Sequence, residues 1–209
     1  GTECPTDGSA KCTSCDDGYH TFTLPEGITF HVDAKECWGS TPGGEMIDLS
    51  SHGHELEGRN AVPVCDGTSF HGKPGFDLHG KGARTQEGIQ LNEKNTIFAV
   101  VITKNGIANY GAVFHHGGRD SDFILERRGS SNSMILQTDN SNACSIDIPY
   151  DVSVVYVGKI DRDSRDLWMF TKNDDGTVVS TTRQASNDAL NIRPVKIYVG
   201  VSDNNERYN

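Results

Sequence analysis

The stretch NTIFAVVITKNGIANYGAVFHHGG, residues 95–118, holds two apolar runs around a polar turn and ends in His-His-Gly-Gly. The first run, 96–104, is almost entirely apolar, which is the pattern of a central strand that is covered on one or both faces. Asn105-Gly106 is a turn signal between the runs. The stretch therefore predicts two sheet strands, while its paired histidines raise the alternative of a metal site.

The geometry of a strand decides between these alternatives. Consecutive side chains of a strand point to opposite faces, so His115 and His116 are predicted to lie on opposite sides of the sheet. They are then badly placed to share one ion. His52-Gly53-His54 has a spacing that can chelate zinc, but it falls in a predicted polar turn. We therefore interpret the histidines as parts of strands and turns, and the chain is not predicted to be a metalloenzyme.

Beyond this stretch, short apolar runs recur at intervals of roughly 10 to 14 residues, which is the spacing of strands in a β-sandwich. Glycine-bearing turn signals separate them, for example 129–131 and 174–176. The only plausible helical turn is short, at 185–191. The pattern predicts a two-sheet antiparallel sandwich whose further strands are 28–34, 109–116, 122–127, 133–138, 152–160, 166–172, 176–182 and 194–201.

Composition and charge agree with an all-β protein. The chain has 209 residues, enough for one domain of ordinary size with a small appendage. It is rich in glycine, and strand formers outnumber good helix formers. The formal net charge of −10 argues against nucleic acid or an anionic membrane as the main partner. No apolar run is long enough to be inserted across a bilayer.

The cysteines indicate disulfides and an extracellular location. They are even in number and crowded toward the N-terminus, and the Cys12-x-x-Cys15 pair has no second pair to complete a zinc site. Residues 1–24 have almost no apolar side chains, so this segment must be held by crosslinks. All six cysteines are predicted to be oxidised: Cys4, Cys12, Cys15, Cys37, Cys65 and Cys144.

Two resemblances give the chain a domain organisation. The sequence CTSCDDGYH, within residues 1–24, resembles part of an EGF-like cysteine-rich repeat. Residues 25–209 resemble a laminin-G/concanavalin-A-like jelly-roll domain, which implies a jelly-roll sandwich. The motifs that carry this second resemblance occur in the order that such domains show, at 32–34, 46–54, 72–77, 96–101 and 195–209.

The resemblance also implies that a strand is missing. Domains of this type end in a strand resembling Gly-x-Ile-Ala-Glu, and this sequence does not contain one. We therefore expect the domain to lack its last strand and to expose an unpaired sheet edge after 195–201. Either a continuation of the chain or another copy would complete the sheet, which makes self-assembly through that edge a possible property.

Calcium is the cofactor that the resemblance implies. Laminin-G-like and pentraxin-like sandwiches often hold calcium at a rim, with loop carboxylates and carbonyls, which are the oxygen ligands that this ion prefers. The acid-bearing loops here are 119–122 and 202–206. The predicted ligands are Asp120 and Asp122, followed by Asp203.

The acidic residues do not predict an enzyme. Glycoside hydrolases of this fold class usually carry two carboxylates on one strand in a Glu-x-Asp-x-x-Glu pattern. Glu45, Asp48, Glu55 and Glu57 lack that spacing and are predicted to lie in loops. No nucleophile, zinc-protease or phosphate-loop motif is present. A polysaccharide-active enzyme is therefore only a distant third hypothesis for the function.

Two function hypotheses from different classes remain. The first is a non-catalytic extracellular module that recognises glycan or another matrix or cell-surface component. It needs aromatic faces beside polar groups, and the candidates are Trp168, Tyr110 and Tyr198 on strands and Trp38 in a loop. In 166–170 both alternating sets are apolar, so this strand is either covered on both faces, which we favour, or turns one set toward a groove or partner. The alternative is a structural subunit of an extracellular adhesive or filamentous assembly.

Overall fold

The part of the chain that the computed structural model describes contains thirteen strands. The described residues are 27–33, 46–59, 63, 65–70, 73–78, 81–92, 94–103, 110–117, 123–128, 133–138, 142–147, 149–161, 166–172, 177–184 and 194–200. Every strand pairing in them is antiparallel, which confirms the predicted all-β, two-sheet sandwich. No helix among these residues has the length and apolar character needed to cross a membrane.

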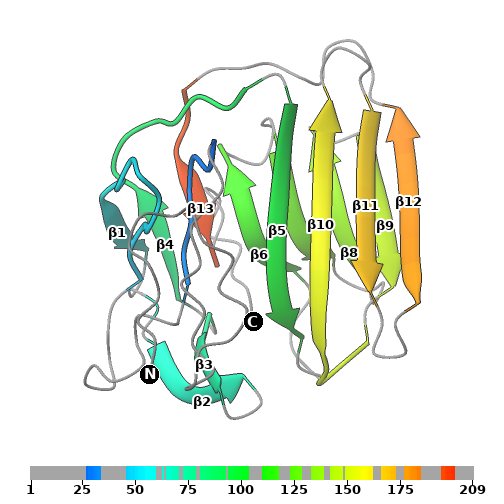
Figure 1. Cartoon of the computed structure of the whole chain (residues 1–209), viewed down its shortest axis with the longest axis horizontal. Helices are drawn as coiled ribbons and strands as arrows, with labels where there is room; N and C mark the ends of the chain where they lie inside the picture. Colours follow the sequence, from blue (N-terminus) through cyan, green and yellow to red (C-terminus); the bar gives the residue numbers. More distant parts are fainter. Residues whose placement is uncertain are drawn as a thin grey trace, which may run out of the picture.

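Two large sheets form the layers of the sandwich (Figure 1). One is seven-stranded, in the order β1 (Leu56–Arg59), β4 (Gly82–Thr85), β13 (Ile197–Val199), β6 (Tyr110–His116), β7 (Phe123–Arg128), β8 (Ser133–Thr138) and β9 (Asn142–Asp147). The other is four-stranded, in the order β12 (Val178–Gln184), β11 (Asp166–Lys172), β10 (Ser153–Asp161) and β5 (Lys94–Ile102). A separate hairpin joins β2 (Cys65–Phe70) to β3 (Lys73–Phe76).

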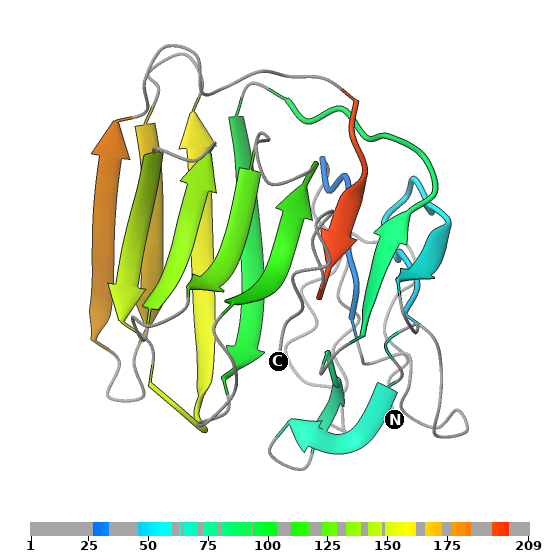
Figure 2. The same cartoon turned by 180° about the vertical axis from the view of Figure 1, so that it is seen from behind.

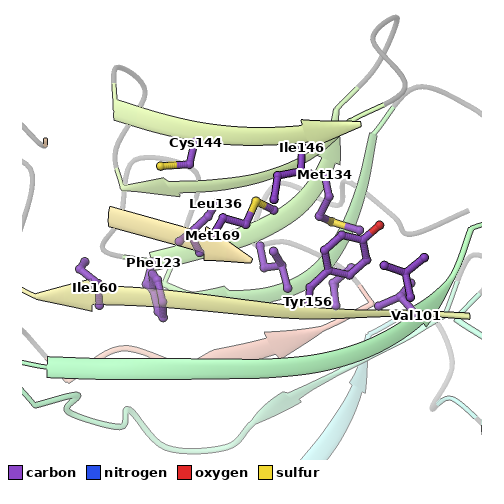
Figure 3. Packing of buried hydrophobic residues seen from close by; sticks show 12 residues of the cluster. Val101, Phe123, Met134, Leu136, Cys144, Ile146, Tyr156, Ile160 and Met169 are labelled. Atoms are coloured by element: carbon purple, nitrogen blue, oxygen red, sulfur yellow. The ribbon is translucent and has the colours of Figure 1, made fainter. Parts of the chain in front are cut away.

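The main core fills the space between the two sheets (Figure 3). Tyr156 and Met169 reach it from the four-stranded sheet, and Phe123 and Leu136 reach it from the seven-stranded sheet. Gly158 of β10 faces Leu136 so closely that an added Cβ would lie 2.7 Å from the leucine Cδ1. A side chain on β10 at this point would therefore require Leu136 to shift within the core.

A second, smaller core lies under β4 and β13. Ala83, Ile197 and Val199 pack there with Met46 and Ile89. Residues 28–34 were predicted as a strand, but the described residues 27–33 form none. Their period-two alternation still has a physical basis, because Phe30 and Val32 pack against this core. The segment is held by hydrogen bonds to 48–49, where His31 N donates to Asp48 Oδ1 and Leu49 N donates to the His31 carbonyl.

The C-terminal strand does not lie at a sheet edge. β13 pairs with β4 on one side and with β6 on the other, as seen from behind in Figure 2. The expectation of an unpaired edge beside 195–201 is therefore wrong, because the strand is inserted between two strands that precede it in sequence. The edge strands of the two described sheets are β1, β9, β5 and β12. Whether a further strand follows Asn209 stays a prediction.

The two described cysteines differ in their chemistry. Cys65 at the start of β2 is disulfide-bonded, as predicted. Cys144 was predicted to be oxidised, but it is a buried thiol. Its position opposite Leu136 places the sulfur among the apolar side chains of the main core (Figure 3). Burial raises the pKa of this thiol to about 11, although Arg183 acts in the opposite direction. Cys4, Cys12, Cys15 and Cys37 lie outside the described residues.

Candidate functional site on the outer face of the four-stranded sheet

The outer face of the four-stranded sheet is largely apolar. Directly opposed residues in an antiparallel sheet share a face, and Ala99 and Tyr156 oppose each other on the side of the core. The next residues along each strand must therefore point outward. The residues that form this apolar outer face are Phe98, Val100, Val155, Val157, Trp168, Phe170 and Val178.

This face carries most of the exposed large apolar side chains in the described part of the chain. Phe98 is 74% exposed, Val178 is 63% exposed and Val100 is 55% exposed, and Val155 joins them. Trp168 and Phe170 are half-buried between their neighbours. Contiguous exposed apolar surface rimmed by polar groups marks interaction sites in soluble proteins. We therefore take the outer face as the candidate functional site.

The exposure also changes two expectations from the sequence. The apolar run 96–104 was predicted as a central strand, but among the described strands β5 has a partner on one side only, and its outward-facing side chains are exposed. For 166–170 we favoured a strand covered on both faces. The half-exposed Trp168 and Phe170 instead favour the alternative, in which one set of side chains faces a partner.

Next to the exposed apolar residues, a row of mostly polar residues crosses the outer face of the sheet. Thr96, Lys159, Trp168 and Thr182 are opposed in register across the four strands. The Lys159 ammonium lies 5.9 Å from the centre of the Trp168 ring, a distance at which a cation is attracted to the face of an indole. The row thus sets one aromatic ring beside an ammonium and two hydroxyl groups. In the row beyond it, Lys94 and Asp161 form an ion pair at 3.1 Å.

The other predicted ligand-binding residues do not join Trp168. Tyr198 lies on β13 in the opposite sheet, is 5% exposed and hydrogen-bonds with Arg84. Tyr110 begins β6 in the same sheet, opposite Arg128, and its side chain is not among the described ones. A single site containing Trp168 and Tyr198 is therefore excluded by the fold. Trp38 and the predicted calcium ligands, Asp120, Asp122 and Asp203, lie outside the described residues.

Asp48 has a structural role, because both of its carboxylate oxygens accept hydrogen bonds from the chain. Its Oδ1 accepts hydrogen bonds from the backbone N–H groups of His31 and Ser50, and its Oδ2 accepts from His54 N and Ser50 Oγ, all at 2.8–2.9 Å. Burial by itself would raise the pKa of this carboxyl group. The hydrogen bonds from His31, Ser50 and His54 outweigh burial and lower the pKa below its ordinary value.

Glu57 also has a structural role. It was predicted in a loop, but it lies in β1, because pairing with β4 makes a strand of a segment that has no alternating pattern. Its carboxylate accepts hydrogen bonds from Lys196 and from Arg84, and these lower its pKa. Glu55 is exposed, and Glu45 lies outside the described residues. The described carboxylates Asp48 and Glu57 are thus bound by other groups of the chain.

The histidines are arranged as the strand geometry predicted. His116 points to the inner side of β6, where its Nε2 donates to the Ile89 carbonyl at 2.6 Å. His115 lies on the opposite face, with its Nε2 3.6 Å from Glu126 Oε2. His52 and His54 stack on each other, and His54 Nδ1 lies 3.1 Å from Glu87. Among the described residues there is no group of three side chains that could hold a metal ion.

Sequence reasoning selected Trp168 but missed Phe98 and Lys159. Both occur in predicted strands, and the alternation of 153–159 shows that Lys159 shares a face with Val155 and Val157. The missing information was the sheet order. It makes β5 and β10 neighbours and leaves their common outer side uncovered in the described structure.

Comparison with known proteins places the fold among sandwiches. No family model matches the sequence, and no curated protein matches it. The chain is similar to the crystal structure of an HCR/D mutant, with a TM-score of 0.52 and 13% identity over 79% of this chain and 43% of that one. The shared feature is the fold.

Two further similarities are weaker. One is to the binding domain of botulinum neurotoxin DC in complex with SialylT, with a TM-score of 0.49 and 8% identity over 81% of this chain and 42% of that one. The other is to the Ruminococcus gnavus IT-sialidase CBM40 bound to α2,3-sialyllactose, with a TM-score of 0.42 and 13% identity over 61% of this chain and 81% of that one. The chain thus spans less than half the length of the HCR/D and neurotoxin DC structures.

Proposed function

We propose that this chain is a non-catalytic, extracellular recognition module that binds glycan on the outer face of its four-stranded sheet. The observation that carries the proposal is the row of Thr96, Lys159, Trp168 and Thr182 beside the exposed apolar row. Sugars present apolar C–H faces and a rim of hydroxyl groups. An amphipathic aromatic side chain flanked by hydrogen-bonding groups matches both.

The roles within the row follow from this chemistry. The indole of Trp168 supplies the surface on which a sugar ring stacks. The Lys159 ammonium is placed to donate hydrogen bonds to the sugar hydroxyls, and the hydroxyl groups of Thr96 and Thr182 can both donate to them and accept from them. Because these residues come from four neighbouring strands, the sheet fixes their spacing before any ligand arrives. A preformed site loses little entropy on binding.

A glycan array followed by calorimetry on the retained sugars tests the proposal. We expect Trp168→Ala and Lys159→Ala to weaken binding at least about tenfold each, the effect of roughly 1.4 kcal/mol. The matched control is Ile47→Ala, which removes an exposed apolar side chain that lies off this face and is predicted to leave binding unchanged. Failure of the array to retain the protein on any sugar would contradict the proposal, as would equal affinities for Trp168→Ala and the unmodified chain.

The same samples test the absence of catalysis. We expect chromatography of the retained sugar after prolonged incubation to recover it uncleaved. Cleavage that disappears in an Asp48→Asn or Glu57→Gln variant of unchanged stability would instead support the enzyme hypothesis. The alternative, a structural subunit of an extracellular adhesive or filamentous assembly, stays a prediction.

A further inference from the structure

Lys159 is the one charged residue in the row of Thr96, Lys159, Trp168 and Thr182. Its side chain is exposed, and its ammonium lies over the Trp168 ring, 5.9 Å from the ring centre. Among the described residues it forms no ion pair. The row therefore carries a positive charge that no described acid neutralises, in a chain whose formal charge is −10.

The acidic residues of this face lie in one neighbouring row only. Asp161 follows Lys159 by two positions on β10 and forms an ion pair with Lys94 at 3.1 Å. Asp166 opposes Asp161 on β11. On the other side of Lys159 lies the row of Val157, which contains no charged residue. A negatively charged group can therefore reach the ammonium from that side without passing an acidic residue of the sheet.

Stacking of a sugar on Trp168 changes the surroundings of the Lys159 ammonium. The ammonium is attracted to the face of the ring, and a sugar that covers the same face displaces it. A neutral sugar offers the displaced ammonium only hydroxyl groups, which water also supplies. A carboxylate offers it a charge-assisted hydrogen bond, which is about twice as strong as a neutral one. The arrangement therefore favours a sugar that carries a negative charge.

The position of Thr96 matches a carboxylate in particular. Thr96 directly opposes Lys159, and side chains opposed in this way have Cβ atoms about 4.5–5.5 Å apart. The two residues present an ammonium and a hydroxyl donor side by side, and a carboxylate has two oxygens that accept hydrogen bonds. Trp168 lies on the other side of Lys159, because β10 runs between β5 and β11 (Figure 1). A sugar ring stacked on Trp168 can thus extend a carboxylate toward Lys159 and Thr96, across one strand spacing of about 4.8 Å.

We propose that the ligand of this face is an acidic sugar, with a carboxylate bonded directly to the ring that stacks on Trp168. The inference rests on the proposed glycan-binding function and adds the class of sugar. Lys159 and Thr96 bind the carboxylate, and Trp168 binds the ring. The overall negative charge of the chain repels such a ligand only weakly, because charges beyond about 8 Å are largely screened at physiological ionic strength.

Calorimetry on three forms of one sugar tests the role of the charge. The probes are the carboxylate-bearing glycan that the array retains best, its methyl ester, and its counterpart with a hydroxymethyl group in place of the carboxylate. The ester nearly keeps the shape of the acid and removes its charge. We expect the acid to bind at least about tenfold more tightly than either neutral form. Equal affinities of the acid and its methyl ester would overturn the inference and leave the glycan site in place.

Substitutions assign the preference to its residues. Lys159→Gln should reduce the ratio of acid to ester affinity to within about twofold, whereas Lys159→Arg should keep most of it, because a guanidinium also donates to carboxylates. Thr96→Val should lower the ratio about threefold, the effect of one hydrogen bond. Trp168→Ala should weaken the acid and the ester by similar factors. The matched control is Lys196→Gln, which makes the same change in net charge at a lysine bound to Glu57 of the other sheet, and it should leave the ratio unchanged.

Other results would also overturn the inference. One is an array that retains neutral glycans only. Another is equal retention of sulfated and carboxylate-bearing glycans, because the site would then select charge and not a carboxylate. Equal loss of the preference in Lys196→Gln and Lys159→Gln would indicate a long-range effect of net charge. An array that retains no glycan at all would remove the proposed function, and the inference with it.

Discussion

Replacing Asp48 is predicted to destabilise the domain strongly, because its carboxylate ties the segment 27–33 to the turn at 48–54. Its two oxygens accept four hydrogen bonds, three of them from the backbone N–H groups of His31, Ser50 and His54. Asp48→Asn keeps the Oδ1 pair but puts an NH₂ group against His54 N–H and Ser50 Oγ. Hydrogen bonds to charged groups are worth about 1.5–3 kcal/mol each, and the loss is only partial since the loop is near water. We expect a loss of about 2–4 kcal/mol for Asp48→Asn, with Asp48→Ala at the upper end.

The pH dependence gives this prediction a second signature. The pKa of Asp48 is lowered in the folded state, so the folded protein holds the carboxylate more tightly than the unfolded chain does. Its contribution to stability is present in full above the unfolded pKa of about 3.9 and is lost as the pH falls through the lower, folded pKa. The difference between the unmodified chain and Asp48→Asn should therefore be constant near neutrality and should shrink below about pH 4.

Urea denaturation at several pH values measures both effects. Asp147→Asn, an exposed acid on β9, is the matched control and should change the free energy of unfolding by less than about 0.5 kcal/mol. Ser50→Ala removes only the hydroxyl donor and should cost about 1 kcal/mol. The reasoning is refuted if Asp48→Asn is as stable as the control at neutral pH. It is equally refuted if its deficit is as large at pH 3 as at pH 7.

Three further predictions concern other parts of the chain. Gly158→Ala should lower the free energy of unfolding by about 1–3 kcal/mol through overpacking, and adding Leu136→Val should recover part of this in the same urea assay; no recovery would mean that the contact is not the cause. Alkylation of the denatured, unreduced monomer should label two or four thiols, because Cys65 is in a disulfide and Cys144 is not; a mass showing none contradicts the buried thiol. Calcium added to chelator-treated protein should raise the melting temperature, and Asp120→Asn should reduce that rise; identical melts with calcium and chelator would remove calcium from the expected cofactors.

The sequence predicted those elements whose own side chains carry the signal. Residues 133–138 and 166–172 form strands with the predicted limits, since their apolar content and flanking turns are local properties. β1 and β9 were not predicted, because LEGR and NACSID have weak patterns and become strands through pairing with β4 and β8. Local alternation cannot show which neighbour a strand finds. Cys144 illustrates the same limit, since its pairing state depends on the core around it.

The candidate site was predicted in part for the same reason. Trp168 was selected from the apolar character of its strand, and its half-exposed position is consistent with that choice. Tyr198 was selected on equal grounds, yet its strand lies in the other sheet and its side chain is buried. Lys159 joins Trp168 only because β10 and β11 are hydrogen-bonded neighbours in a particular register. The sequence shows which residues are aromatic, but the residues that lie beside them on the surface depend on the order and register of the strands.

The position of β13 has a consequence for how the chain acquires its fold. The strand lies between β4 and β6 and pairs with both. The edges of β4 and β6 that face β13 therefore stay unpaired until residues 197–199 have been synthesised and have joined the sheet. A ribosome that has synthesised everything up to β12 has made both halves of the large sheet without the strand that joins them. Contacts between residues so distant in sequence form slowly, and during that time the unpaired edges of β4 and β6 can pair incorrectly. Completion of the seven-stranded sheet is therefore expected to be a late step in folding, and the partly folded chain is expected to be prone to misassembly until that step.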